Sequence, residues 1–170
     1  GISQLPWKCA FGAHAVFCDF LYLFGGGSDE HVRSAARFEC QTGQWQMLPP
    51  MTHGRFGAVA VTAPNGDFFV CGGSPARSGS VAGPAPPLEC FRSTLGFWEL
   101  LFHCKLAQNS FASAVRLDGH VYIIGGRARG GEVTDAAARM DVRSGVLRAL
   151  PPMPEALIGF SCVALLPPQQ

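Results

Sequence analysis

Histidine and cysteine are the side chains of this sequence best suited to a zinc site, and their spacing argues against such a site. The chain has five histidines and seven cysteines, with no C-x-x-C pair and no histidine at a ligand spacing from another histidine or a cysteine. His103 and Cys104 are neighbours, but adjacent residues of a strand point to opposite faces. We therefore predict no metal site and no cofactor. The cysteines are interpreted as buried free thiols, with a disulfide framework or a zinc site as alternatives.

Acid–base catalysis would need ionisable side chains that face each other, and the carboxylates show no such pairing. Glu39, Glu89 and Asp141 are interpreted as one repeated position, whose expected role is hydrogen bonding in turns or between repeats. The sequence also contains no nucleophile elbow, no P-loop and no dinucleotide-binding glycine motif before a helix. We therefore predict no catalytic residue and a protein that is not an enzyme.

Arginine is the residue type best suited to binding a partner. Arg77 follows the double glycine at 72–73, and Arg127 and Arg129 follow the double glycine at 125–126. Guanidinium groups bind carboxylates through paired hydrogen bonds, so these residues favour contact with an acidic peptide. The single Arg/Gly segment does not indicate nucleic-acid binding in a chain whose net charge is +1.

The positions of these side chains depend on a stretch that occurs three times. It consists of four apolar residues followed by two glycines, and its copies are 21–26, 68–73 and 121–126. An unbroken apolar run is typical of a strand buried on both faces. The glycines suit a place where a Cβ has no room or where φ is positive. The repetition indicates an array of equivalent units.

Each unit shows the same order of four strand candidates. A first strand such as Phe56–Val61 leads into the double-glycine strand, and Asn65-Gly66 and Asp118-Gly119 predict two-residue hairpins with positive φ at both positions. A third strand follows a polar loop. The fourth ends at Leu-Pro-Pro-Met in the first and third units. A further first strand, Phe160–Leu166, has no unit behind it. The sequence thus predicts an all-β fold of three four-stranded antiparallel meanders plus one extra strand.

The unit resembles the kelch repeat, which joins a strand ending in Gly-Gly to an aromatic third strand, a turn with a tryptophan and a Leu-Pro-x-Met close. Phe38–Trp45 and Leu48–Met51 match this pattern in the first unit. In the third unit, Leu150–Met153 matches the close, while Met140–Leu147 departs from the pattern with Met140 in place of the aromatic residue and Leu147 in place of the tryptophan. The resemblance covers residues 11–166 and implies blades of a kelch-type β-propeller. The expected divisions are an N-terminal tail at 1–10, interpreted as a remnant of a preceding blade, blade one at 11–54, blade two at 55–108, blade three at 109–154, and at 155–170 an extra first strand of a further or partner blade.

The resemblance also implies a function, because kelch propellers bind partners mainly through the loops after the double glycine and before the first strand. We expect a protein–protein interaction module, such as a substrate adaptor or scaffold. The alternative is a propeller enzyme acting on a sugar-like small molecule at the central axis, which a pocket of convergent, partly buried charges would favour. The residues expected on the partner-binding face are Asp29, Glu30, His31, Arg33, His53, Arg55, Arg77, Asn109, Ser110, Arg127 and Arg129.

Composition argues against several other classes of protein. The chain is 48% hydrophobic and 15% charged, which is too apolar for a disordered tail. No apolar run approaches the ~20 residues of a membrane span. Unpaired cysteines favour a cytoplasmic location. Because three blades cannot close a ring, we expect either self-association or completion by further blades.

Overall fold

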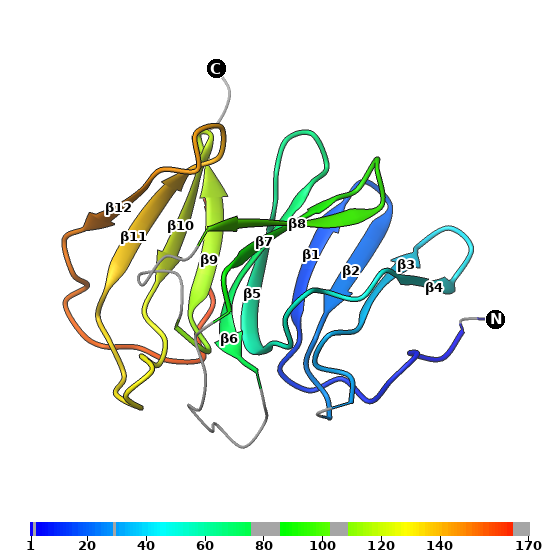
Figure 1. Ribbon diagram of the computed structural model, residues 1–170, viewed down its shortest axis with the longest axis horizontal. Helices are drawn as coiled ribbons and strands as arrows, with labels where there is room; N and C mark the ends of the chain where they lie inside the picture. The colour runs from blue at the N-terminus through cyan, green and yellow to red at the C-terminus, as the bar shows by residue number, and fades with distance from the viewer. Residues whose placement is uncertain (2, 29, 76–85, 103–108, 165–170) are drawn as a thin grey trace.

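The computed structural model describes residues 1, 3–28, 30–75, 86–102 and 109–164, and strands are its only regular secondary structure there (Figure 1). Twelve strands form three antiparallel sheets, each built from four consecutive strands, so the predicted all-β architecture of three meanders is confirmed. In the described part of the chain, no helix is long and apolar enough to cross a membrane. The strands are β1 (Ala13–Phe17), β2 (Phe20–Phe24), β3 (Ala35–Glu39) and β4 (Gln44–Leu48) in blade one; β5 (Phe56–Thr62), β6 (Phe68–Ser74), β7 (Leu88–Arg92) and β8 (Phe97–Phe102) in blade two; and β9 (Ser113–Leu117), β10 (His120–Ile124), β11 (Ala137–Asp141) and β12 (Leu147–Leu150) in blade three.

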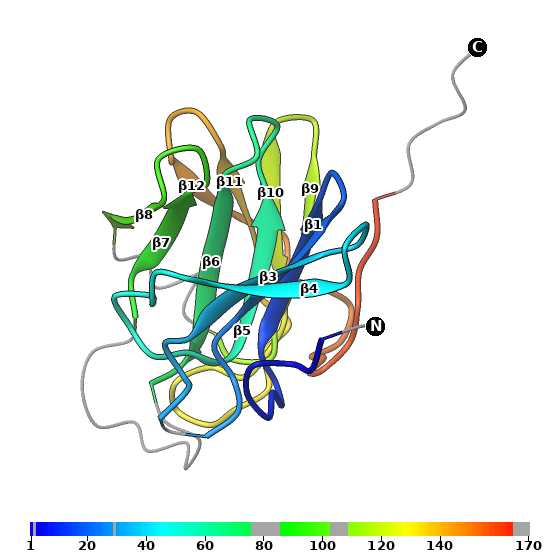
Figure 2. The ribbon, with the colours of Figure 1, turned by 90° about the vertical axis from the view of Figure 1, so that its right-hand side faces the viewer.

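The three sheets stand side by side, with blade two between the others (Figure 1). Their first strands β1, β5 and β9 are neighbours, and Figure 2 looks along the row with blade one in front. One apolar cluster joins blade one to blade two through Phe24 and Phe68, and a second joins blade two to blade three through Phe69 and Val121. Blade two therefore buries both of its faces against neighbouring sheets, as the unbroken apolar runs predicted, and blades one and three each bury one face against blade two.

The double glycines meet both predicted requirements. Gly25 and Gly26 have φ values of +66° and +73°. A Cβ on Gly26 would lie 2.4 Å from the backbone nitrogen of Gly12, which leaves no space for a side chain. The Gly26 N–H donates to the carbonyl of Arg55 at 2.9 Å. This glycine therefore closes blade one against the segment that leads into blade two.

The methionine of each Leu-Pro-Pro-Met close has a matching structural position. Met51 is fully buried, and its methyl group lies 3.1 Å from the place where a Cβ of Gly25 would be. The methyl group of Met153 lies at the same distance from the corresponding place at Gly125. In both blades the methionine fills the space left by the first glycine, so the close belongs to the scaffold.

The two predicted hairpins differ. Asp118 and Gly119 have φ values of +48° and +74°, which confirms that turn. At Asn65-Gly66 only the glycine has positive φ, so the predicted two-residue turn is wrong. The connection runs from Ala63 to Asp67 because the side chain of Asn65 donates to Asp67 at 2.9 Å and closes a longer loop.

The predicted extra strand is not formed. Residues 155–164 contain no strand, while Leu165 and Leu166 lie outside the described residues. The physical reason is that a first strand needs a second strand for its hydrogen bonds, and the described residues supply none.

The same segment nevertheless follows the path of a first strand. Gly126 donates to the carbonyl of Leu157 at 2.8 Å, just as Gly26 donates to Arg55. Gly159 then donates to Phe111 at 3.0 Å. Residues 157–164 therefore run beside β9, where the first strand of a next blade would lie.

Candidate functional site

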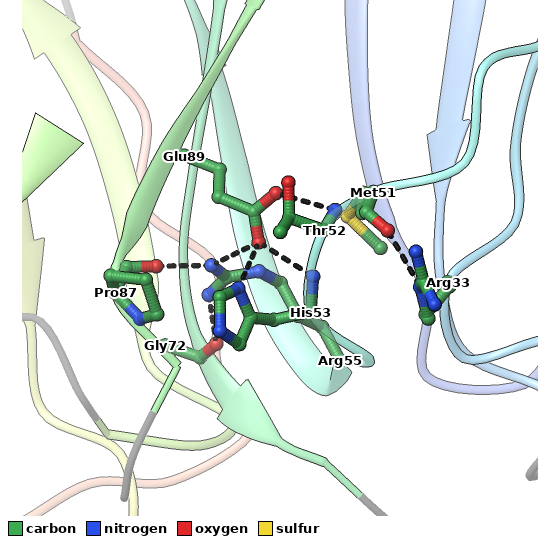
Figure 3. Close-up of polar contacts among 8 residues, drawn as sticks. All are labelled: Arg33, Met51, Thr52, His53, Arg55, Gly72, Pro87 and Glu89. Atoms are coloured by element: carbon green, nitrogen blue, oxygen red, sulfur yellow. Dashed lines mark hydrogen bonds and ion pairs between the residues drawn. The ribbon is translucent and has the colours of Figure 1, made fainter. Parts of the chain in front are cut away.

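A fully buried ion pair lies in blade two, next to the segment that connects it to blade one (Figure 3). Arg55 lies just before β5 and Glu89 lies in β7, and both side chains have no exposed surface. The Arg55 Nη2 donates to Glu89 Oε1 at 2.9 Å. Arg55 also donates to the carbonyls of Gly72, at 2.9 Å, and Pro87. Burial lowers the pKa of Arg55 and the charge of Glu89 opposes that shift, so Glu89 helps to keep the guanidinium charged.

Glu89 also holds the connection between the two blades. Its Oε2 accepts from the backbone N–H of Thr52 at 2.8 Å, and its Oε1 accepts from that of His53 at 3.1 Å (Figure 3). The Nδ1 of His53 lies 3.3 Å from the same Oε1. The carboxylate is thus surrounded by donors from its own protein, which assigns it a structural role.

The predicted place of Arg55 on the exposed partner-binding face is wrong, because its side chain is needed inside the blade. A turn with positive φ leads into each first strand. The residue two positions before that turn donates a hydrogen bond to the carbonyl of the first glycine in the double glycine of the same blade. The three contacts are Cys9 Sγ to Gly25 at 3.7 Å, Arg55 Nη1 to Gly72 at 2.9 Å, and Asn109 Nδ2 to Gly125 at 2.9 Å. Asn109 is therefore tied to the scaffold in the same way as Arg55.

The interpretation of three carboxylates as one repeated position is also wrong. Glu39 pairs with Phe20 and Asp141 pairs with His120, at equivalent ends of their sheets. Glu89 instead pairs with Val70, three residues further into the blade. The similar Glu-Cys dipeptides at 39–40 and 89–90 suggested an alignment that the strand register does not follow.

The remaining predicted residues share one end of the blades, where the loops after the second strands meet the segments before the first strands (lower end in Figure 1). Glu30, Arg33, Arg127 and Arg129 are exposed, and His31, His53, Asn109 and Ser110 are partly buried. Asp29 and Arg77 lie outside the described residues. Within the set, the backbones of Ser110 and Arg127 exchange two hydrogen bonds, whereas Arg33 donates from Nε to the Met51 carbonyl at 2.7 Å.

An aromatic group at this end was missed by the sequence analysis. The rings of Phe11, Phe56 and Phe111 contact one another, with centroids 5.1–6.0 Å apart. Phe11 is 61% exposed. Phe11 and Phe111 also have φ values of +59° and +55°, at the turn where blade two has Gly57. Bulky residues rarely adopt this conformation, and such strain often marks functional positions.

A groove runs from these rings along the first strands. Its volume is about 530 Å³, and the described residues that line it are mostly glycine, alanine and serine, with His14 and Cys162 as the ionisable side chains. This lining provides no acid–base pair. Among the described residues, no group of three or more His, Cys, Asp and Glu side chains could hold a metal ion.

The six described cysteines differ in exposure, and Cys9 and Cys162 are partly buried. Cys71 and Cys90 are buried, whereas Cys18 and Cys40 are exposed because they lie at the ends of strands. Cys104 lies outside the described residues, and the six described cysteines are all free thiols. The expectation of buried thiols therefore holds for the blade-two residues and is wrong for Cys18 and Cys40.

Thiol labelling should separate these environments. Burial raises the pKa of both Cys71 and Cys90 to about 12, so the reactive thiolate is scarce in the folded protein. We expect iodoacetamide to modify Cys18 and Cys40 in the native chain and to reach Cys71 and Cys90 only after denaturation. Peptide mass spectrometry measures this order, and equal labelling of all four in the native state would contradict it.

The chain is similar in sequence to Kelch-like proteins and in fold to a solved structure. No family model matches it. It is 29% identical over 146 residues to Kelch-like protein 38 of Rattus norvegicus, covering 82% of this chain and 24% of that protein. It is 35% identical over 68 residues to Kelch-like protein 25 of Rattus norvegicus, covering 40% of this chain and 11% of that protein. The solved "Structure of YjhT" superimposes with a TM-score of 0.74 at 20% identity, over 93% of this chain and 57% of the other, which is a similarity of fold.

Proposed function

We propose that this segment of a kelch-repeat β-propeller is a protein-interaction module, which binds its partner at the end of the blades that carries the double-glycine loops. The observation that carries the proposal is the exposed ring of Phe11, which packs on the partly buried Phe111 and the buried Phe56 beside exposed arginines. Arg127 joins this group directly, because its backbone pairs with Ser110 next to Phe111.

The chemistry of this end suits a protein partner. Aromatic residues and arginine are enriched among the residues that contribute most to binding energy at protein interfaces. Phe11 would supply apolar area to a partner, and Arg127 would supply a guanidinium for a carboxylate. An acidic peptide segment with an apolar side chain fits this combination. A role as a cytoplasmic substrate adaptor or scaffold belongs to the same proposal.

The alternative enzyme has less support. A sugar-processing site would require convergent, partly buried charges near the axis. The groove along the first strands has small, mostly uncharged side chains instead. The described charges that are fully buried, Arg55 and Glu89, are occupied by each other and by backbone groups.

Charge reversal tests the proposed face. Replacing Arg127 and Arg129 with glutamate, with or without Arg77→Glu, should weaken capture of partner proteins at least about tenfold without unfolding the chain. Affinity purification with quantitative mass spectrometry measures capture, and circular dichroism checks folding. The matched control reverses Arg116 and Arg143, which lie near the hairpins at the opposite end. Equal capture by both variants would remove the proposal.

We infer that further blades, rather than a second copy of this chain, complete the propeller ring. Residues 157–164 already occupy the path of the next first strand. A second copy would bring its own β1 to the same place, so while this segment stays there a copy can pack on blade three only outside the register that closes a ring. The completing sheet should therefore supply a second, third and fourth strand.

The isolated chain should associate without closing at two copies. Among the described residues, blades one and three each have a neighbouring sheet on one face only, and heterologous contacts that do not close produce open-ended assemblies. Light scattering over a range of concentrations should show a mass that keeps rising. A stable monomer would contradict the association, and a mass that levels off at two copies would contradict the strand argument.

A further inference from the structure

Blade three has a basic pocket on the face turned away from blade two, remote from the proposed partner-binding end. Its volume is about 300 Å³. Strands β10, β11 and β12 and the turn between the last two supply its walls. The lining residues are His120, Arg139, Asp141, Ser144, Val146 and Arg148.

Two arginines stand directly opposite each other in this pocket. Arg139 of β11 pairs in register with Arg148 of β12, so both side chains project from the same face of the sheet. Arg139 is partly buried and Arg148 is exposed. No hydrogen bond or ion pair joins either guanidinium to another described residue. Like charges at directly opposed positions destabilise a sheet, so an anion between them would be favourable.

Blade one shows how the same position is satisfied without an anion. Arg37 occupies the place of Arg139, since each pairs with the tyrosine three residues before its double glycine. Arg37 donates to Gln46 at 2.9 Å, and its guanidinium lies 4.7 Å from the centre of the Phe20 ring. In blade three, Arg148 replaces the glutamine and His120 replaces the phenylalanine. The arginine is retained while both of its neutral partners become basic residues.

Asp141 does not neutralise this group. Its Oδ1 accepts hydrogen bonds from the backbone N–H of Ser144 at 2.7 Å and of Arg143 at 3.0 Å, and from the Ser144 hydroxyl at 2.9 Å. These bonds, those from Ser144 above all, lower the pKa of Asp141, so the carboxylate stays charged and holds the turn. Its Oδ2 lies 3.8 Å from His120 Nε2. Two guanidinium groups thus face one carboxylate that is already engaged.

We infer that this pocket binds an oxyanion of the phosphate-monoester class. A phosphate offers enough acceptor oxygens for two guanidinium groups at once, whereas a carboxylate matches a single one. Further blades would not close the site, because the Arg37–Gln46 pair stays exposed although blade two packs against that face of blade one. The inference does not depend on the proposed partner-binding end.

The test compares inorganic phosphate with a short peptide that contains phosphoserine, using chemical-shift titration of the full chain. Both probes should shift the amides of 139–148, and equal concentrations of chloride should not. The variant Arg148→Gln recreates the blade-one pair, so it should fold at least as stably and bind phosphate at least tenfold more weakly. The matched control Arg116→Gln should keep the wild-type affinity. Tighter binding of the peptide assigns the phosphate to a modified partner, and equal binding assigns it to free phosphate.

Two results would overturn the inference. One is the absence of specific shifts with either probe. The other is an Arg148→Gln variant that binds phosphate as tightly as the unaltered chain. Arg139→Gln supplies a second variant with the same expectation, so a folding defect in one of them does not decide the outcome.

Discussion

Replacement of Glu89 by alanine is expected to destabilise the fold by about 3–5 kcal/mol, because it leaves the Arg55 charge buried without its partner. The loss extends beyond the ion pair, since the carboxylate also accepts from the backbone N–H groups of Thr52 and His53. With both side chains fully buried, water cannot replace these contacts. Because domains of this kind are only marginally stable, most of the folded population should be lost.

Denaturant titration measures this effect, and a matched salt bridge provides its control. Glu99 pairs with Arg92 at 2.6 Å, but its side chain is 42% exposed. Glu99→Ala should therefore cost about 0–1 kcal/mol. The double variant Arg55→Met with Glu89→Leu should recover part of the loss, because it removes both buried charges together. Equal destabilisation by Glu89→Ala and Glu99→Ala would show that burial does not determine how much the Arg55–Glu89 ion pair contributes to stability.

The strands were predictable because their signals are local. An apolar run that ends in two glycines predicts where a strand lies and where a Cβ has no room, as Gly26 shows. The C-terminal segment shows the limit of such signals. Phe160–Leu166 has the composition of a first strand, but strand formation also requires a hydrogen-bonding partner, and residues 155–164 find none in the described chain.

The role of Arg55 could not be predicted from the chain, since its partner lies 34 residues away in β7. A charged residue before a first strand is expected on the surface, because burial of an unpaired charge is unfavourable. Only the strand register brings Glu89 to it. The positions of Glu39 and Asp141 were easier, because each closes a turn with residues next to it.

Phe11 escaped prediction for a different reason. The chain contains 13 phenylalanines, and most positions of this type belong to cores. Residue type therefore does not separate Phe11 from Phe24 or Phe68, which are fully buried. The distinguishing properties are its exposure and positive φ, which belong to the folded state.

Substitution of Gly26 by alanine is the second change expected to have a large effect. The new Cβ would lie 2.4 Å from the nitrogen of Gly12 and 2.7 Å from the carbonyl oxygen of Ala10, so backbone must move. Positive φ alone costs about 1–2 kcal/mol for a residue with a Cβ. Crowding of a packed site adds about 1–3 kcal/mol. We therefore expect a loss of about 3 kcal/mol or more in the free energy of unfolding.

Gly119 separates the two causes of that loss. Its φ of +74° matches the +73° of Gly26, but a Cβ there would meet nothing within 4 Å. Gly119→Ala should therefore show the backbone strain alone, about 1–2 kcal/mol. Denaturant titration of both variants gives the contribution of crowding by difference. If the two variants lose equal stability, the double glycine is required for its φ angles only, and the close approach of Gly12 and Ala10 to Gly26 contributes nothing measurable.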